Sequence, residues 1–218
     1  MWCIPRVDDE FKRRMHEILD LYEKPYDAQL PVVCLDEKLV ELRSDAREGY
    51  HAEGGYRRDY EYQRHGTANV FMITDPKGGR HWARVTARRT KRDFAHAMAF
   101  LAARYPSVIT IHLVMDNLNT HTEASLIETF GVERGRRLWA RFSVHYTPKH
   151  ASWLDQAEIA LAVTTRCCLG KRRFATIDAL RHTLVRFWAA RRKLRWKIDW
   201  KWTATDAKKW LKTLKSQH

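Results

Sequence analysis

The spacing of apolar residues divides the chain into segments of helical and of strand-like character. Apolar residues recur every three or four positions between 11 and 22, which predicts an amphipathic helix that ends before Pro25. The next run, LPVVCLDEK, is apolar, too short for a core helix and closed by two acids, so we expect a strand. Residues 43–59 are polar, contain glycines and lack periodicity, which predicts a loop.

Two further strands should follow this loop as a hairpin. The segment TANVFMITDPKGGRHWARVTARRT carries turn residues at 75–79, so its two halves are expected to pair in antiparallel fashion. The stretch KRDFAHAMAFLAARYP then has helical spacing and stops at Pro106. A helix between strands normally returns the chain to a parallel neighbour, and IHLVMDN is the strand that it reaches.

The second half of the chain continues with helices and one more strand. We expect a short helix in HTEASLIETFG, a strand in RFSVHYTP, and a helix in SWLDQAEIALAVTTRCCLG that starts near Ser152. A last long helix falls in IDALRHTLVRFWAARRKL. This order of elements predicts an α/β layered domain.

The length and the charge of the chain narrow its class and its partners. With 218 residues the chain fits one large domain. Its net charge of +14 and pI near 9.9 favour a polyanionic partner. No apolar stretch approaches the roughly 20 residues of a membrane span, and no signal-peptide pattern opens the chain. We therefore expect a cytoplasmic, nucleoid-associated protein that binds nucleic acid and no membrane.

Acids at the ends of two predicted strands are the candidate reactive groups. The strand runs deliver Asp36 and Asp116 to the region where α/β proteins tend to gather reactive side chains. Side chains alternate along a strand, so only one of Asp36 and Glu37 can join Asp116. Asp155 and Glu158, three positions apart in a predicted helix, compete for the place of a third acid.

Converging carboxylates repel one another unless a cation lies between them. Oxygen ligands select hard ions such as Mg²⁺ or Mn²⁺, and two such ions about 4 Å apart can assist in-line phosphoryl displacement. Each acid alone is more often a turn residue, a helix cap or part of a solvated face. Their combination with a strongly basic chain favours phosphodiester chemistry.

Several blocks of the sequence closely resemble the catalytic domain of bacterial insertion-sequence transposases of the mariner superfamily, the DDE type. These blocks are VVCLDEK, DYEYQRHGTANVFM, VTARRTKRDFA, VMDNLNTHT and HYTPKHASWLDQAEI. The resemblance implies an RNase H-like mixed sheet flanked by helices and a cut-and-paste reaction on transposon-end DNA that uses two Mg²⁺ or Mn²⁺ ions. It also implies that Asp36, Asp116 and Glu158 are the catalytic, metal-binding acids, with Asp155 as a further candidate ligand.

Polar residues next to these acids are expected to contact DNA: Lys38, Asn117, His121, Lys149 and His150. For His121 a structural hydrogen bond competes with this role, and for the Lys149–His150 pair a solvated loop does. The basic block RFWAARRKLRWK fits an exposed helix face as well as a DNA contact. A homodimer on DNA is expected from the resemblance, because two transposon ends must be joined.

The sequence also departs from the family pattern. Position 155, usually Asn in such sequences, is Asp155 here, and the helix-turn-helix modules of full-length relatives do not precede the catalytic blocks. We expect a helical lead-in at 1–30, the RNase H-like catalytic domain at 31–195 and a basic, aromatic tail at 196–218 packed on it, with DNA recognition encoded separately. A non-catalytic DNA-binding remnant and another RNase H-like nuclease, such as a junction resolvase, are the alternatives.

Overall fold

The computed structural model describes residues 7–215, and its centre is a sheet of five strands. In spatial order these strands are β5 (Arg80–Thr86), β4 (Tyr62–Asp75), β1 (Val32–Asp45), β6 (Ile111–Met115) and β7 (Phe142–Tyr146). β4 is antiparallel to β1 and to β5, whereas β6 is parallel to both β1 and β7. The predicted α/β fold with an RNase H-like mixed sheet is confirmed.

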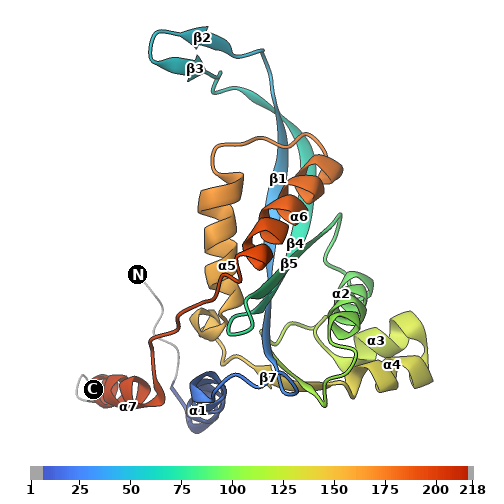
Figure 1. Cartoon of the computed structure of the whole chain (residues 1–218), viewed down its shortest axis with the longest axis vertical. Coiled ribbons are helices and arrows are strands. Elements are labelled where there is room, and N and C mark those ends of the chain that lie inside the picture. The colour runs from blue at the N-terminus through green and yellow to red at the C-terminus, as the bar shows by residue number, and fades with distance from the viewer. Residues whose placement is uncertain (1–6, 216–218) are drawn as a thin grey trace.

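Helices cover both faces of the sheet (Figure 1). One face is covered by α2 (Lys91–Arg104), α3 (Glu123–Phe130) and α4 (Val132–Trp139). The other is covered by α1 (Asp9–Glu23), α5 (Ala157–Val163) and α6 (Ile177–Lys193). Side chains alternate along β1, so Leu35 packs in the core under α2 while Cys34 packs in the core under α1.

Strand β1 does not end at its acids as the apolar pattern predicted. It continues to Asp45, paired with β4 for most of its length. Charge pairs support this outer half: Glu41 contacts Arg64, and Arg173 reaches Asp45. Val40 and Leu42 of this outer half alternate with charged residues and pack in the core under α6, so the acids at 36 and 37 do not mark the end of the strand.

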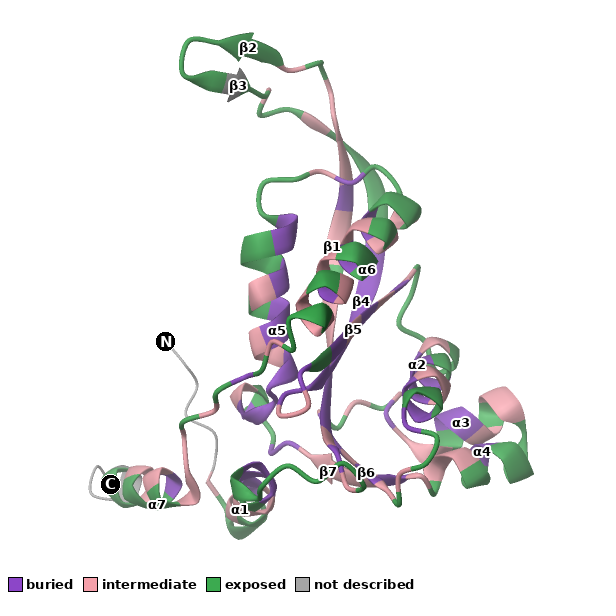
Figure 2. Cartoon of the chain, in the orientation of Figure 1, coloured by how far each residue is buried: buried purple, intermediate pink, exposed green. Residues whose placement is uncertain are grey.

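The region 43–59 is not the loop that was expected. It holds the end of β1 and a small hairpin of β2 (Tyr50–Ala52) and β3 (Gly55–Arg57), which projects from the far end of the sheet (Figure 1). Gly54 lies in its turn at φ 94°, a conformation that glycine adopts without strain. β2 is exposed along its length (Figure 2), so this strand buries no apolar side chain.

The helix predicted from Ser152 starts later and changes its winding. Residues 152–154 form a 3₁₀ turn, α5 begins at Ala157, and a π-helical segment (Thr164–Leu169) follows it. Asp155 therefore precedes the helix instead of sharing a helical face with Glu158. Helix α4 was not predicted, because its sequence VERGRRLW offers few apolar positions.

The described part of the tail packs by its aromatic rings. Helix α7 (Ala204–Lys215) lies beside α1 (Figure 1), with the rings of Trp210 and Phe11 6.3 Å apart. Trp196 packs on Trp188 of α6, with 5.9 Å between ring centres. Residues 1–6 of the expected lead-in and 216–218 of the expected tail lie outside the described residues. None of the helices within 7–215 combines the length and apolar character of a membrane span.

Candidate active site

Asp36, the first acid of the site, lies within β1 and pairs with Met72 of β4. Its side chain points to the face covered by α1 and α5, and Oδ1 accepts a hydrogen bond of 2.7 Å from the Glu37 N–H. Burial and the nearby charges of Glu158 and Asp116 outweigh this hydrogen bond and raise the pKa of Asp36 to about 6. The negative charge of Asp36 is therefore costly unless a cation approaches it.

Asp116, the second acid, is the residue immediately beyond β6. Leu35 and Met115 are partners in the parallel pairing of β1 and β6, so the residues that follow them, Asp36 and Asp116, emerge side by side. The Asp116 side chain is 37% exposed, which leaves part of its carboxylate open to solvent. The end of β6 at this point thus presents an acid next to Asp36.

Glu158 joins these two acids from the first turn of α5, the helix that packs on β1 and β4. It is half-buried, and its negative charge contributes to the raised pKa of both Asp36 and Asp155. Asp116 and Glu158 therefore both lie near enough to Asp36 for their charges to act on it. No described lysine or arginine forms an ion pair with any of the three.

These acids do not by themselves form a complete metal site. Within residues 7–215, no three His, Cys, Asp or Glu side chains come close enough to hold a metal ion by themselves. Mg²⁺ keeps several waters and shares substrate phosphate oxygens, so its sites often use only one or two carboxylates from the protein. The oxygen-only donors and the unrelieved repulsion around Asp36 fit such a hard divalent ion.

Asp155 occupies a different position from the one expected of a metal ligand. It is 3% exposed, and its Oδ1 accepts a hydrogen bond of 2.8 Å from the Ala157 N–H at the start of α5. Burial and the negative charge of Asp36 raise the pKa of Asp155 well above its ordinary range. Because its side chain closes the turn into α5 and faces inward, we expect Asp155 to position Glu158 instead of binding metal.

The substitution Asp155→Asn should therefore preserve activity. The Asn side chain keeps the acceptor for the Ala157 N–H and removes a buried acid, so the free energy of unfolding at pH 7.5 should rise. We expect the rate of DNA cleavage to stay within about threefold of wild type, less than about 1 kcal/mol in activation free energy. Urea unfolding and a plasmid-nicking assay measure the two effects, and a stable but inactive variant would make Asp155 a ligand.

A buried histidine connects Asp116 to Glu37 on the opposite face of β1. Nδ1 of His121 lies 2.7 Å from Oδ1 of Asp116 as an ion pair and 3.1 Å from the Asp116 carbonyl, which is its hydrogen-bond acceptor. Nε2 lies 3.1 Å from Oε1 of Glu37. Burial alone would lower the pKa of His121, but its contacts with Asp116 and Glu37 raise that pKa to about 9.

The expected DNA contact by His121 does not fit this position. Its side chain is 1% exposed and its ring stacks on Phe94, with 4.5 Å between ring centres. Tyr146 donates a hydrogen bond of 2.7 Å to the His121 carbonyl. The residue is fixed in the interior, and it orients Asp116 instead of reaching a phosphate. Glu37 was missed in the sequence because its link to Asp116 depends on the fold.

The other expected DNA contacts are more accessible. Lys38 is half-buried, two residues beyond Asp36 and on the same face of β1. Asn117 is exposed directly after Asp116. Lys149 and His150 are exposed in the segment between β7 and the 3₁₀ turn, where His150 has the unusual φ of 63°. These four residues stay candidates for contacts with DNA.

Sequence and structure comparisons agree on the family and the fold. The DDE superfamily endonuclease family matches residues 31–181, more than two thirds of the 218-residue chain. No curated protein sequence matches the chain. The crystal structure of the catalytic domain of Mos1 mariner transposase is similar over 89% of both chains, with a TM-score of 0.58 and 12% identity.

Larger Mos1 assemblies contain the same fold. The Mos1 strand transfer complex matches with a TM-score of 0.60 and 15% identity, over 90% of this chain and 59% of that chain. The paired end complex with Mn matches with a TM-score of 0.58 and 14% identity, over 90% and 60%. The chain thus spans about 60% of the length of these transposase chains. It belongs to the DDE superfamily endonuclease family and has the fold of a mariner transposase catalytic domain.

Proposed function

We propose that this protein is the catalytic core of a DNA transposase, which hydrolyses a phosphodiester at a transposon end and transfers the freed end into target DNA. The convergence of Asp36, Asp116 and Glu158 in a DDE endonuclease fold carries the proposal. The matched Mos1 structures are paired end and strand transfer complexes, some with Mn or Mg. They support DNA as the substrate, divalent ions as cofactors and the joining of two ends; a homodimer that joins them is part of the proposal.

The three acids would hold two Mg²⁺ or Mn²⁺ ions, which supply Lewis-acid stabilisation of the charge that develops on the phosphate. Hydrolysis forms a bond from water oxygen to phosphorus and breaks the bond to the 3′ oxygen, which leaves as a hydroxyl. That hydroxyl then attacks a target phosphate and displaces another 3′ oxygen. The protein's part is to hold Asp36 and Asp116 in register on adjacent strands and to place Glu158 from α5.

A plasmid-nicking assay tests the proposal. Wild-type protein with Mn²⁺ should convert supercoiled plasmid to the nicked form, and EDTA should stop the reaction because the acids then lack their cation. Asp36→Asn should be inactive in the same assay, since the first acid is lost. Asp20→Asn, at an exposed acid of α1, is the matched control and should match wild type. Nicking by Asp36→Asn at the wild-type rate would refute the assignment.

A further inference from the structure

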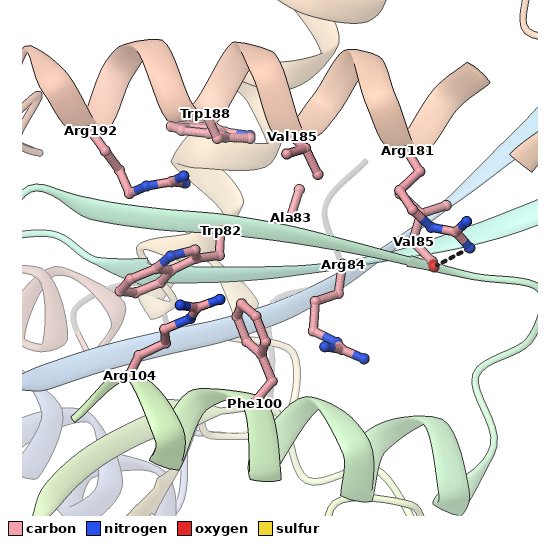
Figure 3. Close-up of a pocket in the computed structure, with 10 residues that line it drawn as sticks. All are labelled: Trp82, Ala83, Arg84, Val85, Phe100, Arg104, Arg181, Val185, Trp188 and Arg192. Atoms are coloured by element: carbon pink, nitrogen blue, oxygen red, sulfur yellow. Dashed lines mark hydrogen bonds between the residues drawn. The ribbon is translucent and has the colours of Figure 1, made fainter. Parts of the chain in front are cut away.

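A basic pocket opens at the edge of the sheet, away from the three acids. It lies around β5, between α2 and α6, and encloses about 410 Å³ (Figure 3). This volume is within the range of about 300–1,000 Å³ typical of ligand sites. Four arginines and three aromatic residues line it: Arg84, Arg104, Arg181, Arg192, Trp82, Phe100 and Trp188. No acidic residue lines this site, which we call the arginine pocket.

Aromatic rings hold three of the four guanidinium groups in place. The guanidinium carbons of Arg84 and Arg104 lie 4.8 Å and 4.4 Å from the centre of the Phe100 ring. Arg192 lies 5.8 Å from the centre of the Trp82 ring. Stacking on a ring fixes the plane of a guanidinium while its N–H groups stay available to an acceptor. The pocket therefore presents donors in fixed positions.

The positive charges of the pocket lack counter-charges in the described structure. Among its arginines only Arg181 has an ion pair, with Asp178. The Nε of Arg84 is buried without a hydrogen-bond partner in the described chain. Burial, followed by the charges of Arg181 and Arg104, lowers the pKa of Arg84, and burial with Arg104 does the same for Arg192. A bound anion would remove this repulsion and supply the missing acceptors.

The outer edge of β5 is already capped, which disfavours a peptide strand as the occupant. Arg181 donates to the Val85 carbonyl at 3.3 Å, as the dashed line in Figure 3 marks, and Arg192 donates to the His81 carbonyl. Added strands bind an edge through such carbonyls. These two carbonyl acceptors are occupied, and the pocket presents guanidinium donors. It therefore suits an anionic ligand.

The sheet register relates the arginine pocket to the acids. Asp36 pairs with Met72, and Met72 pairs with Ala83 of the pocket, so two strand spacings, about 10 Å, separate the backbones. This is below the ~12 Å width of a DNA major groove. We propose that the arginine pocket binds phosphate groups of the DNA backbone, as a second contact beside the acids. The proposal rests on the function proposed above, which makes DNA the substrate.

The salt dependence of DNA binding tests this assignment. Each phosphate contact contributes about 0.9 to the slope of log affinity against log salt concentration. The double variant Arg84→Gln/Arg104→Gln should lose one to two such contacts, so its slope should fall by about 1 to 2 and its affinity at low salt by roughly tenfold. Fluorescence anisotropy with a labelled DNA duplex gives both values.

A matched control removes the same charge elsewhere. Arg134 stacks on Phe130 at 4.8 Å, and Arg137 pairs with Glu133, both on the exposed face of α4. Arg134→Gln/Arg137→Gln should keep the wild-type slope. If the pocket variant fails to fold by circular dichroism, Arg104→Gln alone, at an exposed residue, should still lower the slope by about 1.

Two further measurements distinguish failure of the pocket assignment from failure of the proposed transposase function. If the folded pocket variant keeps the wild-type slope and wild-type protein nicks plasmid in Mn²⁺, the assignment of the pocket to phosphate binding is wrong. The proposed transposase function would then still stand. A lowered slope with no metal-dependent nicking would support the pocket and count against the catalytic proposal. Inorganic triphosphate that binds wild type but not the variant in calorimetry, while the DNA slope is unchanged, would overturn DNA as the source of the phosphate.

Discussion

Asp116→Asn should lower the rate of metal-dependent DNA cleavage by about a thousandfold or more and leave the affinity for DNA close to that of wild type. Asn has the shape of Asp but no charge, so it cannot help to hold a divalent cation beside Asp36. A bound cation contributes several kcal/mol of charge stabilisation, and about 4 kcal/mol corresponds to a thousandfold in rate. Single-turnover cleavage in Mn²⁺ and anisotropy of labelled DNA in EDTA measure the two quantities.

The contrast between the two measurements is decisive for this variant. Asp116 neighbours the exposed Asn117, so a damaged loop would weaken DNA binding as well as cleavage. Parallel loss of both would therefore exclude a specific role in metal binding. Glu158→Gln, at the third acid, should reproduce the selective loss from a different element, since α5 supplies that residue.

The sequence was sufficient to predict the frame that holds these acids. Apolar periodicity located α1, α2 and α6, which each bury one face, and an apolar run located the inner half of β4, which is buried on both faces, next to β5. It failed for the outer half of β1, where only Val40 and Leu42 alternate among charged side chains, and for β2 and β3, whose connecting turn contains Gly54. Segments that bury so few apolar side chains give no clear periodic pattern.

Only the site residues that lie at or near the ends of predicted strands could be identified from the sequence. Asp36 and Asp116 lie beside each other because β1 and β6 are parallel partners. The helix before β6 indicated a parallel neighbour, but that helix follows β5, and the sequence did not show that β6 pairs with β1 instead. Asp155 was misplaced because three residues of 3₁₀ turn, and not a helix, precede it. The role of Glu37 depends on His121, five residues beyond Asp116, folding back across the sheet. No local pattern encodes that contact.

His121→Ala should raise the Mn²⁺ concentration needed for half-maximal cleavage by about 10- to 100-fold, the usual effect of removing a group that orients a metal ligand. In wild type His121 contacts Oδ1 of Asp116 at 2.7 Å, and the other carboxylate oxygen stays available to a cation. Without the imidazole, Asp116 can rotate and Glu37, 4% exposed, loses its closer partner and keeps only the 3.7 Å ion pair with Arg89. A buried charge left with no partner costs about 3 to 5 kcal/mol in the free energy of unfolding, and the remaining Arg89 pair should keep the loss below that range.

The double variant Glu37→Gln/His121→Gln separates orientation from stability. It removes both charges of the buried pair, so stability should largely return, whereas Asp116 still lacks its charged partner and the shifted Mn²⁺ requirement should persist. Glu37→Gln alone keeps the contact between His121 and Asp116 and should shift the Mn²⁺ requirement little. If His121 had only a structural role, its loss would lower the maximal rate because less protein is folded. The Mn²⁺ concentration for half-maximal cleavage would then be unchanged in all three variants. A shift that follows His121, and not the free energy of unfolding, makes this buried residue the group that sets the geometry of the second acid.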